Sequence, residues 1–231
     1  MTSDALREAA REARAEAAPF VGLALAAMVV LALISNRYDW HLLHHLYWWI
    51  WLVAASPYAM LALIFAAGLG QARSIAQRRR AAGVLLAVIV VFSLVETGLL
   101  IATLVSPTTH GISASQLLMS AVVIWLSNVI AFGLCFWELD SGGPVGRALS
   151  DRRDTPDIQF PQDENPTLAR PGWAPHLVDY MYLSMTNSIA FSPTDAMPLS
   201  RSAKGLMAVE SAISIIAILF VAARAINILH P

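Results

Sequence analysis

Five long apolar runs constrain the fold of this chain more than any other feature of its 231 residues. Each run is close to the roughly 20 residues that a helix needs to span the hydrocarbon of a bilayer. Only 13% of the residues are charged, against roughly 25% in soluble domains. Because a backbone in lipid must satisfy its own hydrogen bonds, the sequence predicts an all-α integral membrane protein with about five transmembrane helices. The runs are 19–35, 44–68 (with Pro57 expected to kink it), 81–105, 117–137 and 206–229.

Polar segments divide the chain into four predicted regions. Residues 1–18 are rich in Ala, Glu and Arg and predict a solvated helix, followed by a four-helix transmembrane region over 19–138. Residues 139–176 form a polar loop that holds half of the 12 prolines, so no single regular element can occupy it. Residues 177–231 contain a short helix, re-entrant or interfacial, which ends at Ser192-Pro193, and then the last span.

The basic residues predict the orientation of the chain. With five spans, thirteen of the 15 Lys and Arg residues fall on the side of the N-terminus, and only Arg37 and Arg224 fall on the other. Because cytoplasmic segments carry the excess of positive charge, the N-terminus and residues 177–198 are expected in the cytoplasm. The expected location is a cell membrane, the plasma or inner membrane, which the chain crosses several times.

The C-terminal third resembles the pore module of the potassium-channel superfamily over 180–229. When "DAMP" is placed on the family's D-x-x-P, "YLSMT" falls on the pore helix and "PLSRSAKGLMAVESAISIIAILFVAAR" on the inner helix without a gap. The whole chain, with "FWELDSGGP" and "IQFPQ", is also similar to uncharacterised bacterial membrane proteins with five spans. The resemblance implies a homo-oligomer, a tetramer if it encloses a pore, with Thr186, Ser192, Thr194, Asp195 and Glu210 as ion-path candidates.

The filter differs from the family's pattern. Residues 190–194 read AFSPT where the family has T-V-G-Y-G, whose carbonyl oxygens replace the water around the ion. Glycine adopts the required backbone angles at little cost, whereas Pro193 has a fixed φ. We therefore expect a channel-like protein that is not potassium-selective, or else a non-conducting scaffold or accessory subunit. Asp195 either concentrates cations at a pore mouth, caps the last helix or closes an Asx turn. Thr186 and Asn187 either line a pore or form hydrogen bonds at a helix end.

Three polar residues lie inside or beside the spans. Glu96 is either the centre of a proton-coupled transporter or the partner of Asn128 or a serine on a neighbouring helix. Asn128 is expected to form a hydrogen bond between helices. Glu210 is expected either to meet an ion or to pair with Lys204 or Arg201 near the membrane surface.

The remaining motifs exclude several classes of function. His41, His44 and His45 are a weak candidate for a metal site, but five aromatic residues nearby favour a belt at the membrane surface. Cys135 is the only cysteine, so it forms no intrachain disulfide and no zinc cluster. The sequence has no nucleotide-binding or hydrolase motif, which predicts a protein that is not an enzyme and needs no cofactor. The net charge of −1 gives no reason to expect nucleic acid, so the lipid bilayer is the expected partner.

Overall fold

The chain folds almost entirely into helices in a computed structural model that describes residues 3–38, 48–67, 75–105, 114–149, 156–193 and 195–229. The long helices are α1 (Ser3–Arg37), α2 (Trp49–Ala67), α3 (Ile75–Val105), α4 (Ala114–Leu139) and α8 (Arg201–Leu229), with the shorter α7 (Leu177–Ala190) before the last. The connection before α7 contains η1 (Asp140–Gly142), α5 (Gly143–Ala148), β1 (Ile158–Gln159), α6 (Pro161–Glu164) and η2 (Pro166–Leu168), and β2 (Met197–Pro198) precedes α8.

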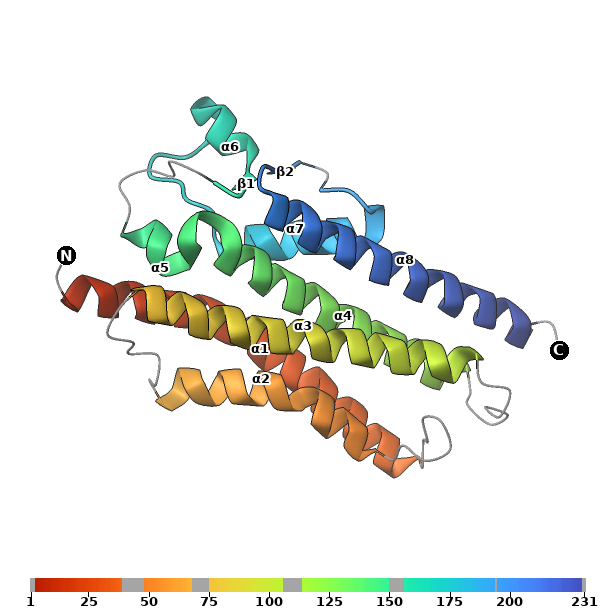
Figure 1. Cartoon of the computed structure of the whole chain (residues 1–231). Helices are drawn as coiled ribbons and strands as arrows, with labels where there is room; N and C mark the ends of the chain where they lie inside the picture. Colours follow the sequence, from red (N-terminus) through yellow and green to blue (C-terminus); the bar gives the residue numbers. More distant parts are fainter. Residues whose placement is uncertain are drawn as a thin grey trace.

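The five long helices lie side by side in an elongated bundle (Figure 1). α4 is at its centre, because it contacts α1, α3, α7 and α8. α1 begins at one end of the bundle and α8 ends at the other (Figure 1). Within the described residues, four helices are long and apolar enough to cross a membrane, and α2 is a shorter apolar helix. The prediction of a helical chain is confirmed, and its apolar helices are consistent with a multi-pass membrane protein.

The N-terminal segment is part of a longer helix than the sequence predicted. α1 runs through residue 18 without a break and contains Pro19. Ala10, Ala13 and Ala17 lie on one face, which continues as Val21 and is buried in the main core. Because these side chains are small, α1 can approach its neighbours closely. The prediction of a solvated helix over 1–18 is therefore wrong for this alanine face, although the charged face is exposed.

The second apolar run forms a helix that begins later than expected. α2 starts at Trp49, where the sequence suggested residue 44, and Pro57 lies inside it. Its side chains pack mainly against α1 and α3. The three histidines of the candidate metal site, His41, His44 and His45, lie outside the described residues.

The proline-rich connection is folded against the bundle and is not merely a polar loop. Val145, Ile158 and Phe160 from this connection are buried in the main core. β1 pairs with β2 in an antiparallel two-stranded sheet, with Ile158 opposite Pro198 and Gln159 opposite Met197. The sheet therefore joins the connection to the chain that leads into α8.

Candidate functional site

The short helix α7 reaches only part of the way along the bundle. It has 14 residues, or about 21 Å, which is less than the roughly 30 Å of a hydrocarbon core. α7 packs against α4 and α8, and the chain then returns to β2 at the end of the bundle where α7 began (Figure 1). Phe191 ends the helix with a left-handed backbone, φ 54°. The short helix predicted before Ser192-Pro193 is therefore present.

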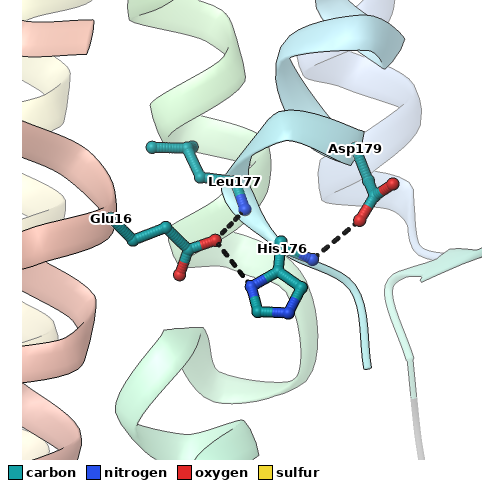
Figure 2. Close-up of polar contacts among 4 residues, drawn as sticks. All are labelled: Glu16, His176, Leu177 and Asp179. Carbon is teal, nitrogen blue, oxygen red and sulfur yellow. Dashed lines mark hydrogen bonds and ion pairs between the residues drawn. The ribbon is translucent and has the colours of Figure 1, made fainter. Parts of the chain in front are cut away.

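Two carboxylates hold the N-terminus of α7 (Figure 2). Glu16 of α1 accepts a hydrogen bond from the backbone N–H of Leu177, and its Oε1 lies 3.3 Å from His176 Nδ1. Asp179 accepts a hydrogen bond of 2.7 Å from the backbone N–H of His176. Negative charge is favourable at a helix N-terminus, where the first N–H groups lack partners within the helix. Glu16 thus fixes the start of α7 on α1.

A second network, which sequence reasoning missed, joins α7 to the connection. Asp140 is fully buried and accepts hydrogen bonds from the Tyr180 hydroxyl at 2.5 Å and from the backbone N–H of Asp157 at 2.8 Å. The Arg147 guanidinium lies 5.1 Å from the centre of the Tyr180 ring and donates to the Trp137 carbonyl oxygen at 2.7 Å. Asp140 follows a buried aromatic run in "FWELD", and that is the only signal of its role in the sequence.

The far part of α7 carries a buried polar cluster, defined here as Ser184 and Asn187 of α7 with Glu210 and Ser211 of α8. The Glu210 carboxylate accepts hydrogen bonds from Ser184 and, at 2.6 Å, from the Asn187 amide. Asn187 also donates to the Met207 carbonyl oxygen at 3.1 Å and accepts from Ser211 at 3.0 Å. The Asn187 amide and both carboxylate oxygens of Glu210 therefore have hydrogen-bond partners within one chain.

Glu210 does not pair with the basic residues that the sequence suggested. Arg201 and Lys204 are exposed, whereas Glu210 is fully buried. At about 100° of rotation per residue, Arg201 lies on the opposite side of α8 from Glu210, and Lys204 is about 120° away. The prediction of an ion pair is therefore wrong, because Glu210 belongs to the helix face that packs on α7.

α7 and the turn after it hold the other ion-path candidates. Ser192 and Asp195 are exposed, and Thr194 lies outside the described residues. Thr186 donates to the Leu183 carbonyl oxygen of its own helix at 3.0 Å. The Pro193 carbonyl oxygen accepts hydrogen bonds from the backbone N–H groups of Asp195 and Ala196. This oxygen is therefore not part of a row of carbonyl groups that point toward an ion, as in a potassium filter.

The cap of α8 comes from Ser200 and not from Asp195. The Ser200 hydroxyl oxygen accepts a hydrogen bond of 3.1 Å from the backbone N–H of Ala203. Ser, Asp, Asn and Thr are all good N-cap residues, so the sequence could not decide between Asp195 and Ser200. The reading of Asp195 as the helix cap is wrong.

The intramembrane candidates Glu96 and Asn128 are both buried but do not bond to each other. Asn128 of α4 donates to Thr97 of α3 at 3.1 Å, which confirms its predicted role between helices. Both carboxylate oxygens of Glu96 lack a hydrogen-bond partner among the described residues. The Tyr58 hydroxyl donates to the Ser127 carbonyl oxygen at 3.0 Å, while the Ser127 hydroxyl lies close enough to influence the Glu96 carboxyl group. Glu96 is thus a buried acid without a well-formed hydrogen bond to the described residues, a state that is costly in a membrane.

Comparison with known proteins does not assign the chain to a family. No protein-family model matches it, and no curated protein or solved structure does. Across the part of the chain that the structure describes, no group of three His, Cys, Asp or Glu side chains could hold a metal ion. The candidate functional site therefore consists of α7, the turn after it and the buried acids.

Proposed function

We propose that several copies of this chain assemble in a membrane into a channel-like permeation path formed by α7, the turn after it and α8. One observation carries the proposal: α7 is too short to span a membrane, and the chain returns to the end of the bundle where α7 began (Figure 1). This order of short helix, return and long helix is the order that the potassium-channel pore module would have. A single turn cannot surround an axial path, so the proposal requires an oligomer, four copies by the resemblance.

The proposed membrane arrangement has five spans and a re-entrant α7. α2 has 19 residues, or about 28 Å, which nearly matches the hydrocarbon thickness. Ser211 lies ten positions after Arg201, so the tip of α7 reaches about 15 Å along α8, near the middle of a bilayer. The positive-inside bias favours entry of α7 from the cytoplasmic side of a bacterial inner membrane, with the N-terminus on that side.

The path would differ chemically from a potassium filter. The Pro193 carbonyl oxygen is engaged by two backbone N–H groups, so it cannot coordinate an ion as filter carbonyls do. The exposed Asp195 of each copy would instead gather cations at the entrance. We expect flux with weak selectivity between sodium and potassium.

Flux through liposomes tests this proposal. Reconstituted protein is expected to release both sodium and potassium, and Asp195→Ala should lower both rates. Glu164→Ala is the matched control, since Glu164 is also an exposed acid but lies on α6, outside the turn. Unchanged flux in a folded Asp195→Ala variant would remove Asp195 from the path. A monomer by light scattering, corrected for bound detergent, would contradict the shared path altogether.

A non-conducting scaffold is the second candidate, and a specific observation favours it. The buried polar cluster satisfies its hydrogen bonds within one chain and offers an ion no vacant ligand at Asn187 or Glu210. In that case the pore module would retain its fold without its filter. Absence of flux from a correctly assembled oligomer would support the scaffold over the channel.

A further inference from the structure

A cavity lies between α2 and α3, and no residue of α7 or α8 lines it. Its volume is about 50 Å³, enough for about three or four water molecules. Val53 and Ala54 of α2 and Val95 and Leu99 of α3 make its wall largely apolar. Val53 and Val95 are themselves exposed, so the cavity is bordered by the apolar outer surface of the bundle.

Two polar groups beside this cavity have no hydrogen bond to a described residue. Glu96 and Trp51 both line it, and their side chains are only 4% and 3% exposed. Neither carboxylate oxygen of Glu96 nor the indole Nε1 of Trp51 makes a hydrogen bond to any described residue. Buried polar groups almost always have partners, so two such side chains beside one cavity indicate that a group other than the described residues completes them.

We propose that this cavity binds small amphiphilic cations, with an ammonium group at Glu96 and an apolar body along Val53 and Val95. A carboxylate attracts a positive charge and accepts N–H hydrogen bonds, and a charged pair of this kind is stronger in a dry site. The indole of Trp51 contributes an aromatic face for the cation and an N–H group for an acceptor on the ligand. The apolar body would extend toward the lipid-facing surface.

The lining argues against other classes of ligand. When it is ionised beside a bound cation, the Glu96 carboxylate would repel an anion. Hard metal ions take six or more oxygen ligands, and Glu96 is the only residue of this cavity's lining whose side chain carries oxygen. Glu210 makes a useful contrast, because its carboxylate is buried too but is completed by Ser184 and Asn187. Of these two buried glutamates, only Glu96 has both carboxylate oxygens without a hydrogen bond to a described residue.

Binding of two probes to the full chain in lipid nanodiscs tests the proposal. Benzylammonium and the neutral benzyl alcohol have similar shapes and differ in charge. Benzylammonium is expected to bind the wild type and to lose about tenfold or more in affinity with Glu96→Gln, since hydrogen bonds to charged groups are worth more than neutral ones. Glu210→Gln, the control, should leave binding unchanged, because Glu210 lies outside the cavity.

A second variant tests the cavity without changing the buried acid, in case Glu96→Gln does not fold. Val95→Phe places a larger side chain at the exposed border of the cavity and leaves Glu96 in place. It should weaken benzylammonium binding as well. Equal binding of benzylammonium to Glu96→Gln, equal binding of both probes to the wild type, or binding of neither probe would each overturn the proposal. The last result would mean that the cavity holds only water.

Discussion

The two buried asparagines give a direct test of how α7 is held. Asn187 and Asn128 are 2% and 4% exposed, so truncation to alanine removes the same atoms from two equally buried places. Asn187 makes three hydrogen bonds to α8, whereas Asn128 makes one to α3. At about 0.6 kcal/mol for an interhelical hydrogen bond in a membrane protein, Asn187→Ala should cost about 2 kcal/mol and Asn128→Ala about 0.6 kcal/mol.

The assay is reversible unfolding in mixed micelles of dodecyl maltoside and dodecyl sulfate, followed by circular dichroism. The quantity compared is the free energy of unfolding of each variant relative to the wild type. Hydrogen exchange on the same samples should show faster exchange over 177–190 for Asn187→Ala, because α7 loses part of its attachment to α8. A cost for Asn128→Ala that equals or exceeds the cost for Asn187→Ala would refute the reasoning.

Two further predictions concern the N-terminal half of α7. Tyr180→Phe removes the hydroxyl that donates to buried Asp140, so the free energy of unfolding should fall by about 1–3 kcal/mol. Proteolysis within 150–176 should also become faster. Unchanged cleavage would contradict the anchoring role of Asp140. Glu16→Gln removes the charge at the helix N-terminus, worth about 0.5–1 kcal/mol, so the Leu177 amide should exchange about two to five times faster. Glu12→Gln, on the exposed face of α1, is the matched control and should leave that amide unchanged.

The sequence predicted the long helices well because hydrophobicity alone determines them. Each apolar run contains a helix, and the errors fall at the ends. α1 extends from Ser3, because the alanines of the charged segment continue the same buried face that Val21 and Met28 occupy in the apolar run. The average polarity of the segment does not show this buried face, but the helical spacing of Ala10, Ala13 and Ala17 indicates it.

The sequence could not predict the network around Asp140. Tyr180 lies 40 residues from Asp140, and neither position has a local pattern that demands the other. The arginines and acids of residues 139–176 resemble a solvated loop by composition, yet Asp140 is buried by the segments that it bonds. Long-range polar contacts of this kind depend on the path of the chain, which composition does not specify.

The two buried glutamates show why residue type alone could not identify the site. The sequence places both acids in or beside a span, and for each, one of two expectations is a partner nearby in the sequence or on a neighbouring helix. The rotation of each helix decides the outcome: Glu210 faces α7 and meets Ser184 and Asn187, whereas Asn128 reaches Thr97, one residue past Glu96. Thr97 lies about 100° around α3 from Glu96, so the Asn128 amide meets Thr97 and not Glu96. Glu210 accordingly joins α8 to α7, and Glu96 is the acid to which we assign the proposed ligand.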